Sequence, residues 1–137
     1  MNINENTQKY LIHLAKKSIQ TILKIPTNTM TEPKDEILFQ HLGAFVTIES
    51  HHHLRGCIGN MIGRKPLKEL IQDLAVQAAF HDPRFDPISK DEFHQVSIEI
   101  SILSPLFHVQ NDLALKSLEI VKNGIFLTSG HQSGVLL

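Results

Sequence analysis

The stretch between residues 66 and 103 carries two consecutive patterns that most constrain the fold. After Pro66, apolar residues recur at three- and four-residue spacing, which predicts a helix with one broad apolar face. These residues are Leu67, Leu70, Ile71, Leu74, Ala75, Ala78 and Ala79. Two Asp-Pro steps in HDPRFDPIS, residues 81–89, end the helix, and VSIEISIL, residues 96–103, then alternates between apolar and polar side chains. The second pattern predicts a strand with one core face and one solvent face.

The first half of the chain predicts a second helix and a hairpin. Apolar residues in 9–23 recur at helical spacing, and residues 24–36, with two prolines, form a surface connection. The apolar positions of this helix are Leu11, Leu14, Ala15, Ile19, Ile22 and Leu23. GAFVTIE, residues 43–49, predicts a buried strand that continues into LRGCI, residues 54–58, after a turn at residues 49–53.

The C-terminal part predicts a small antiparallel meander. An Asn-Gly turn at residues 123–124 and a loop at residues 129–134 separate apolar runs. Helices and strands are interspersed without regular βαβ units, which favours an α+β fold with a mostly antiparallel sheet and flanking helices. A chain of 137 residues suits one domain, residues 1–137.

Composition narrows the class of function. The 13 basic and 14 acidic residues give no field that would attract nucleic acid, and no apolar run reaches membrane-spanning length. The single cysteine cannot form an internal disulfide, and the first ten residues lack the pattern of a secretory signal. We therefore expect a cytoplasmic protein.

That cysteine, Cys57, lies in LRGCIG, residues 54–59, and two interpretations stay open. A thiol reacts as its thiolate, which a nearby cation such as Arg55 favours, and backbone N–H groups freed by Gly56 and Gly59 would stabilise an oxyanion. On a regular strand Arg55 and Cys57 point to the same face. The alternative for Arg55 is that it simply faces a carboxylate partner or solvent. The alternative is an inert, buried thiol beside glycines of a bulge and a turn.

Histidines and carboxylates supply further candidates. The sequence HHH at residues 51–53 suggests metal binding, but no accompanying ligands follow at zinc-site spacing, so neither a metal nor a cofactor is predicted. His81, beside Asp82 and Arg84, is either an acid–base residue or a charge partner for the end of a helix. Glu99 either holds an arginine in place or is exposed on the polar face of its strand.

Several motifs occur in a family-specific order: GAFVTIE, LRGCIG, PLKELIQDLAVQAAFHDPRFDPI, IEISILSP, and NGIFLTSG with SGVLL. In this the chain resembles the AMMECR-one domain family, whose bacterial and archaeal members are also called protein A of the AmmeMemoRadiSam system. The resemblance covers residues 38–137. The helix at residues 9–23 matches the first helix of the family in its apolar pattern more than in its individual residues.

The resemblance implies a two-part α+β fold with a cleft where the LRGCIG segment, the DPRF segment and the glutamate-bearing strand meet. The resemblance places these positions at the cleft, where we expect catalytic roles for Cys57, Asp82 and Glu99, an anion clamp at Arg55, and ligand-binding roles for Gly56, Gly59, Arg84 and Phe85. It further implies a modification pathway shared with a Memo-like protein and a radical S-adenosylmethionine enzyme. The alternative is a non-catalytic module that docks these partners, with Cys57 as a packing residue.

Two departures from the family pattern bear on structure. His51 to His53 replace a polar turn that often contains glycine in relatives, which puts the turn geometry in question. The chain stops at SGVLL, where relatives continue, so the C-terminal part is shortened. An uncovered sheet edge there predicts self-association, with a homodimer as the expected form.

Overall fold

A computed structural model of the chain describes residues 3–105, 125–129 and 132–136. The chain divides into two compact units, Met1–Pro105 and Leu106–Leu137, and each is described by itself. Within the described residues, neither helix combines the length and apolarity that crossing a membrane requires.

The first unit is built on a three-stranded antiparallel sheet in the order β2-β1-β3. The strands are β1 (Ala44–Ser50), β2 (His53–Asn60) and β3 (Val96–Ile102). The central strand β1 alternates between fully buried and more exposed residues, as its sequence predicts, and Ala44, Val46 and Ile48 have no exposed surface. The predicted α+β class with an antiparallel sheet and flanking helices is confirmed.

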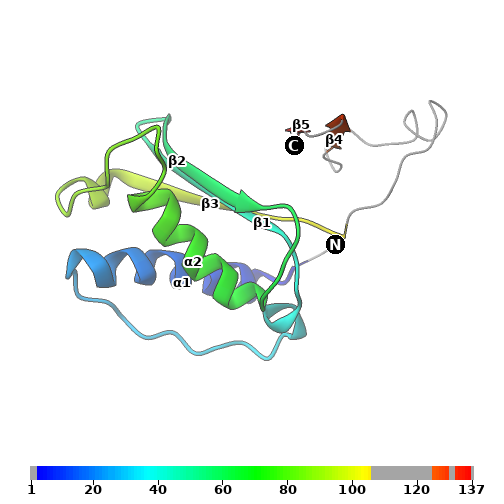
Figure 1. Ribbon diagram of the computed structural model, residues 1–137. Coiled ribbons are helices and arrows are strands. Elements are labelled where there is room, and N and C mark those ends of the chain that lie inside the picture. Colours follow the sequence, from blue (N-terminus) through cyan, green and yellow to red (C-terminus); the bar gives the residue numbers. More distant parts are fainter. Residues whose placement is uncertain (1–2, 106–124, 130–131, 137) are drawn as a thin grey trace. The chain divides into compact units, whose positions relative to one another are not determined.

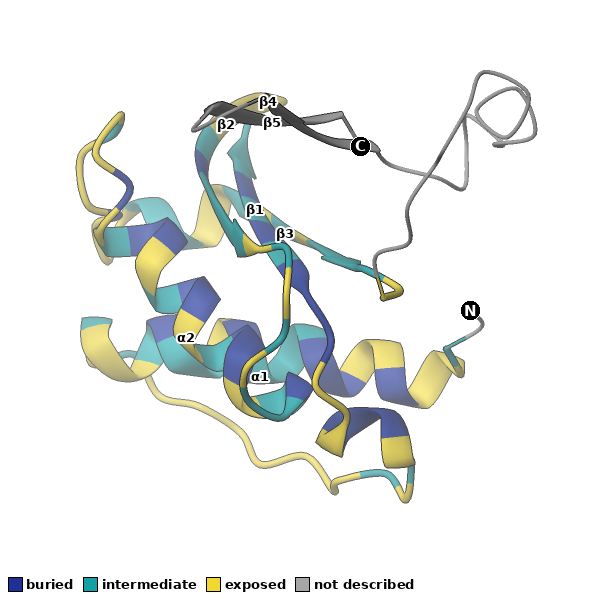
Figure 2. Ribbon diagram, turned by 45° about the vertical axis from the view of Figure 1, so that its right-hand side comes forward, coloured by how far each residue is buried: buried dark blue, intermediate teal, exposed yellow. Residues whose placement is uncertain are grey.

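Two helices, α1 (Glu5–Leu23) and α2 (Leu67–Phe80), lie side by side against one face of this sheet (Figure 1). The buried residues gather where the helices meet the sheet (Figure 2). All seven apolar positions predicted for the second helix are buried, which confirms its apolar face. The other face of the sheet carries the alternate residues of each strand, among them Thr47, Cys57 and Glu99.

Helix α1 begins four residues earlier than its apolar pattern predicts. The side chain of Asn4 accepts hydrogen bonds from the backbone N–H groups of Asn6 and Thr7, at 2.8 and 3.3 Å, and this cap starts the helix. The helix ends at Lys24, which adopts a left-handed conformation with φ of 58°. Ile22, predicted to lie on the apolar face, is instead 51% exposed, although the next residue, Leu23, packs against the core.

The connection after α1 is largely exposed, as predicted, and is tied to the helices by polar contacts. Glu32 accepts hydrogen bonds from the Tyr10 hydroxyl at 3.2 Å and from the Lys68 ammonium at 2.8 Å. The Thr7 hydroxyl donates to Asp35 at 2.7 Å. Two short 3-10 helices, η1 (Glu36–Phe39) and η2 (Glu92–Gln95), were not predicted by periodicity because each is a single turn.

The hairpin between β1 and β2 turns more tightly than its sequence predicts. Both strands extend into the expected turn, so that Ser50 pairs with His53 and only His51 and His52 remain between them. These two histidines have φ values of 50° and 64°, the left-handed conformation that a two-residue hairpin turn requires. Histidine is among the non-glycine residues that tolerate this conformation, so the turn stays tight although it contains no glycine.

The second unit contains an antiparallel pair of strands, β4 (Ile125–Ser129) and β5 (Gln132–Leu136). Leu127 is paired with Gly134, so the described residues of the GIFLT and GVLL segments, 125–128 and 134–136, pair as predicted. The predicted loop at residues 129–134 is too wide, because the strands reach Ser129 and resume at Gln132. The Asn-Gly turn at residues 123–124 lies outside the described residues. The interpretation of residues 1–137 as one domain stays a prediction.

Candidate functional site

The loop that follows α2 places a buried carboxylate, that of Asp82, against strand β2. Asp82 Oδ2 accepts a hydrogen bond from the backbone N–H of Cys57 at 3.0 Å and one from Arg84 Nη2 at 2.8 Å. Its Oδ1 accepts from the backbone N–H and Nε of Arg84, both at 3.1 Å. Arg84 Nη2 also donates to the carbonyl of Cys57 at 3.3 Å. Both backbone polar groups of Cys57 are therefore held by side chains of one loop.

This arrangement keeps Asp82 ionised. The hydrogen bonds from Arg84 are the largest influence on the Asp82 carboxyl and hold its pKa far below the usual range, against the opposing effect of burial. The Asp82 partner raises the pKa of Arg84 in turn, and Cys57 acts in the same direction to a smaller extent. Because both carboxylate oxygens are occupied, the geometry suits a positioning residue better than the catalytic acid or base predicted for Asp82.

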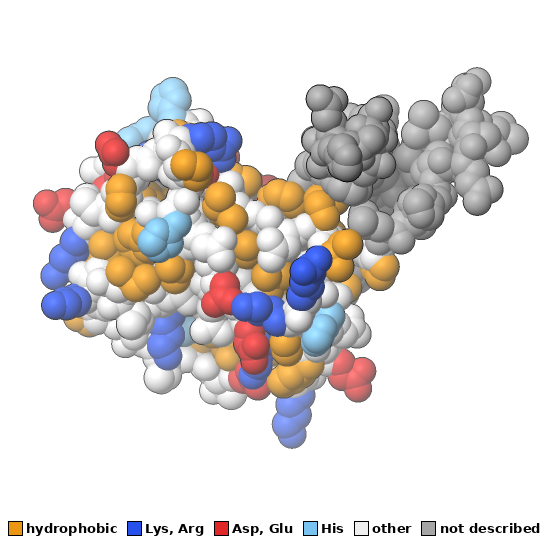
Figure 3. All heavy atoms as spheres, in the orientation of Figure 1, with side chains coloured by type: hydrophobic (Ala, Val, Ile, Leu, Met, Phe, Trp, Pro, Cys, Tyr) orange, Lys and Arg blue, Asp and Glu red, His pale blue; other side chains and the backbone are white. Residues whose placement is uncertain are grey.

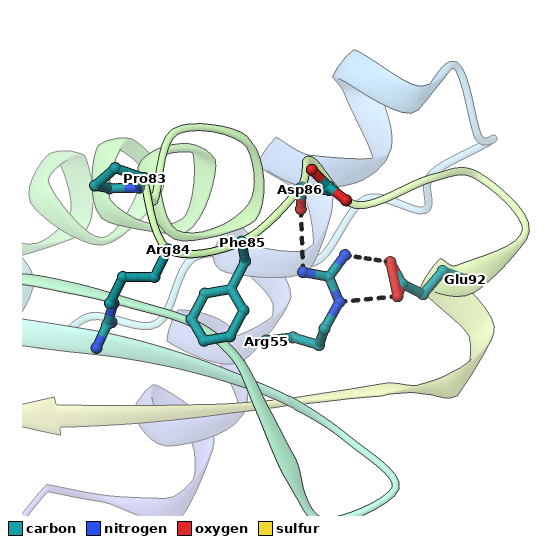
Figure 4. A pocket seen from close by; sticks show the side chains of 6 residues that line it. All are labelled: Arg55, Pro83, Arg84, Phe85, Asp86 and Glu92. Carbon is teal, nitrogen blue, oxygen red and sulfur yellow. Dashed lines mark hydrogen bonds and ion pairs between the residues drawn. The ribbon is translucent and has the colours of Figure 1, made fainter.

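Arg55 pairs with Glu92, which the sequence did not indicate. Arg55 Nε and Nη2 donate to the two carboxylate oxygens of Glu92 at 2.9 and 2.7 Å, and Nη1 donates to the carbonyl of Asp86 at 3.0 Å (Figure 4). This bidentate pair raises the pKa of Arg55 and lowers the pKa of Glu92. The alternative in which Arg55 has a carboxylate partner is correct, but the partner lies in η2.

The expectation that Arg55 and Cys57 share a face by simple alternation is wrong. A β-bulge interrupts the register, because Ile48 pairs with Gly56 while the next residue, Glu49, pairs with Leu54. Arg55 is the extra residue of β2, and a bulge re-aims the side chain at that position. The bulge explains why the Arg55 side chain reaches Glu92 and Asp86.

Cys57 lies instead in a row with Thr47 and Glu99 across the three strands. Thr47 on β1 is paired with Cys57 on one side and with Glu99 on the other. The Thr47 hydroxyl and the Cys57 sulfur are 3.3 Å apart and share a hydrogen bond in which either atom is able to donate. Glu99 is exposed, as one of its two interpretations predicted, and among the described residues it binds neither Arg55 nor Arg84.

The two glycines of LRGCIG have packing roles. A side chain at Gly56 would overlap the carbonyl of Ala78, so its absence allows α2 to approach β2 closely. A side chain at Gly59 would overlap the ring of Phe45, the residue opposite it on β1. Neither position therefore needs a ligand-binding role to account for glycine.

An open hollow of about 520 Å³ lies beside this cluster, lined by Arg55, Pro83, Arg84, Phe85, Asp86 and Glu92 (Figure 4). It contains three of the predicted ligand-binding residues, Arg55, Arg84 and Phe85. Cys57 borders it only through its carbonyl bond to Arg84, and Glu99 lies across β1 from Cys57. Arg84 therefore lines the hollow, whereas Cys57 and Glu99 lie in the neighbouring row on the sheet face away from the helices, and not in the single concavity predicted for all three.

The histidines contribute no metal site within the described part of the chain. No three His, Cys, Asp or Glu side chains there approach closely enough to hold an ion. Histidines gather at the tip of the β1–β2 hairpin (Figure 3), where His51 Nε2 lies 3.3 Å from Gln95 Oε1. His81 directly follows α2, as its sequence position predicts.

Comparison with known proteins decides the family. The AMMECR1 family profile matches residues 12–137, more than half of the chain. The chain belongs to the AMMECR1 family. This confirms the resemblance carried by the LRGCIG and DPRF motifs.

Relatives of this AMMECR1 chain come from distant organisms. A protein of Sulfolobus acidocaldarius is 41% identical over 107 residues, which cover 75% of this chain and 47% of that protein. A protein of Aquifex aeolicus is 34% identical over 131 residues, 93% of this chain and 67% of that protein. The chain thus spans about half of the first relative and two thirds of the second.

A solved structure has the same fold. The crystal structure of the uncharacterised protein PH0010 from Pyrococcus horikoshii matches with a TM-score of 0.83 and 29% identity. The match covers 98% of this chain and 70% of that one. None of these three descriptions states an activity, so function has to be argued from the site.

Proposed function

We propose that this AMMECR1 chain handles a small group on the thiol of Cys57, as a nucleophile or a carrier. The observation that carries the proposal is the double tether of the Cys57 backbone. Asp82 and Arg84 hold its N–H and C=O, while its sulfur lies on the open sheet face beside Thr47. A reactive group acts best when neighbouring contacts fix its position before the ligand arrives.

The polar neighbours of the thiol support this role. A packing cysteine needs only apolar contacts, whereas Cys57 is half-buried, lies opposite a hydroxyl and borders an exposed arginine. The pathway with a Memo-like protein and a radical S-adenosylmethionine enzyme, and a cytoplasmic location, are part of the proposal and rest on the family resemblance alone.

The competing function is a non-catalytic module that docks the same partners, with Cys57 as a structural residue. Alkylation separates the two, because Cys57 is the single cysteine of the chain and every labelled thiol is therefore Cys57. We would measure the second-order rate of its reaction with iodoacetamide at pH 7, in the folded protein and in the same protein unfolded in urea.

A reactive Cys57 predicts a folded-state rate equal to or above that of the unfolded chain. Protection by ten-fold or more in the folded protein would reject the thiol chemistry and leave the docking module. Thr47→Ser, which keeps the hydroxyl, serves as the matched control for Thr47→Val, which removes it. Only Thr47→Val should change the rate if the hydroxyl contact matters.

A further inference from the structure

We infer that the ligand handled at Cys57 bears a carboxylate and that Arg84 binds it. This inference rests on the proposed function, because it names the class of ligand for the same site. It also moves the anion-binding role from Arg55, where the sequence placed it, to Arg84.

The two side chains of the Asp82–Arg84 pair differ in exposure, and this difference makes the outer side of the pair positive. The side chain of Asp82 is 2% exposed, whereas that of Arg84 is 56% exposed. Nε and Nη2 of Arg84 point inward to Asp82 and Cys57, and among the described residues no contact occupies Nη1. A ligand arriving from solvent therefore meets the guanidinium rather than the carboxylate, and Nη1 remains available as a charge-assisted donor.

Arg55 has no comparable capacity. Its side chain is 18% exposed, and Nε, Nη1 and Nη2 each already donate to Glu92 or Asp86. Binding an anion there would require breaking a bidentate pair with Glu92. Both arginines of the hollow are thus paired with a carboxylate, but only Arg84 keeps more than half of its side chain exposed.

The hollow supplies space for the rest of a small ligand. The Arg84 guanidinium lies 5.4 Å from the centre of the Phe85 ring, and Figure 4 shows this ring between Arg84 and the Arg55–Glu92 pair. The ring offers an apolar surface next to the cation. Arg84 contacts both the hollow and Cys57, so a ligand anchored there lies within reach of the cysteine strand.

Four carboxylates oppose anion binding: Asp82 and Glu92 are each paired with an arginine, whereas Glu99 and Asp86 form no ion pair among the described residues. Glu99 lies two strands from Cys57, roughly 10 Å at ordinary strand spacing and therefore about one screening length at physiological salt. Asp86 lies beyond Phe85 as seen from Arg84 in Figure 4. At Cys57 itself, Asp82 binds the N–H and Arg84 binds the C=O, so the two charges balance there, and Arg84 presents the more exposed side chain to a ligand.

The reaction of such a ligand is a displacement. The thiol proton passes to water, and the Cys57 thiolate attacks the electrophilic carbon of the ligand. A sulfur–carbon bond forms, and the leaving group departs with the electron pair of the bond that breaks. Arg84 is a positioning residue, because it binds the carboxylate and takes no part in the bond changes.

Two alkylating reagents that differ only in charge test the inference. Iodoacetate carries a carboxylate and iodoacetamide does not, and both displace iodide with the same thiolate. The ratio of their rates therefore cancels differences in thiolate population and access. The unfolded chain in urea provides the reference ratio. We expect the folded protein to exceed that reference by about 2- to 5-fold, the range of one partly exposed ion pair.

Variants and salt assign the effect to Arg84. Arg84→Gln should bring the ratio to the reference value, whereas Arg84→Lys should keep most of the excess. Arg64→Gln removes the same charge from an exposed residue outside the hollow and should leave the ratio unchanged. Should Arg84→Gln fail to fold, the wild-type protein still decides the matter, since 1 M NaCl should abolish an electrostatic excess.

The outcomes separate the two proposals. A folded-state ratio at or below the reference, with normal iodoacetamide reactivity, overturns the carboxylate inference and leaves the thiol chemistry intact. An excess that persists in Arg84→Gln or in 1 M NaCl also overturns it. Protection from both reagents rejects the proposed function and this inference together.

Discussion

Replacing Asp82 by asparagine tests whether the tether of the cysteine strand stabilises the fold. Asp82→Asn keeps the shape of the side chain but converts one carboxylate oxygen to an NH₂ group. Each oxygen accepts two hydrogen bonds, so two of the four are lost whichever way the amide is oriented.

The size of the effect follows from burial. Hydrogen bonds to a charged group contribute about 1.5–3 kcal/mol each. Arg84 is 56% exposed and regains water when its partner is lost, which reduces the cost. We therefore expect the free energy of unfolding to fall by roughly 2–3 kcal/mol. At a urea dependence of about 1–2 kcal/mol per molar, the unfolding midpoint should fall by about 1–3 M.

Acid should reduce this difference between wild type and variant, and it should remove the difference only below the folded-state pKa of Asp82. The folded-state pKa of Asp82 is lower than its unfolded value, so its contribution is complete at neutral pH and decreases as pH falls below about 4. Urea unfolding followed by circular dichroism at pH 7 and at pH 3 measures both quantities. Asp86→Asn, at an exposed neighbouring carboxylate, should change stability by less than about 0.5 kcal/mol.

Two results would refute this reasoning. Equal stability of wild type and Asp82→Asn at pH 7 would mean that the tether contributes nothing to folding. A difference that stays constant down to pH 3 and below would mean that the charge of Asp82 is not its source.

Other parts of the structure give further predictions. Gly56→Ala should lower the unfolding free energy by about 2 kcal/mol or more, because the added carbon overlaps the Ala78 carbonyl; thermal unfolding measures it, and an unchanged Tm would contradict the packing. Glu92→Gln should cost about 1–2 kcal/mol in urea unfolding by breaking the bidentate pair with Arg55, and no loss would show that the pair is solvated. Self-association stays a prediction, since a two-stranded sheet such as β4-β5 is marginal by itself; a mass of 15.5 kDa by light scattering, unchanged on dilution, would contradict it.

The sequence predicted those parts of the fold that depend on local periodicity. The apolar stripe of α2 identified every buried position of that helix, because seven apolar residues at helical spacing leave no other face to bury. The alternation in β3 similarly separated its partly buried isoleucines from exposed Glu99. Ile22 was misplaced, because apolar spacing does not show how wide a stripe of the helix its neighbours cover.

The candidate site was predicted less well because its contacts join segments far apart in the chain. Arg55 and Glu92 are 37 positions apart, and η2, which carries Glu92, is a single turn without periodic signal. The motifs identified Asp82 and Arg84, but only the geometry shows that they bind each other and the backbone of Cys57. Long-range polar contacts of this kind leave no pattern in one sequence.

The bulge at Arg55 determines which face carries the cysteine. The tight turn at His51 and His52 pairs Glu49 with Leu54. Continued without interruption, that register would place Cys57 opposite Val46, a fully buried residue under the helices. The extra residue shifts the register by one, so that Gly56 faces α2 and Cys57 lies opposite Thr47 on the open face. A single inserted position thus moves Cys57 from the sheet face that packs on the helices to the opposite face, and the bonds from Asp82 and Arg84 hold β2 in that register.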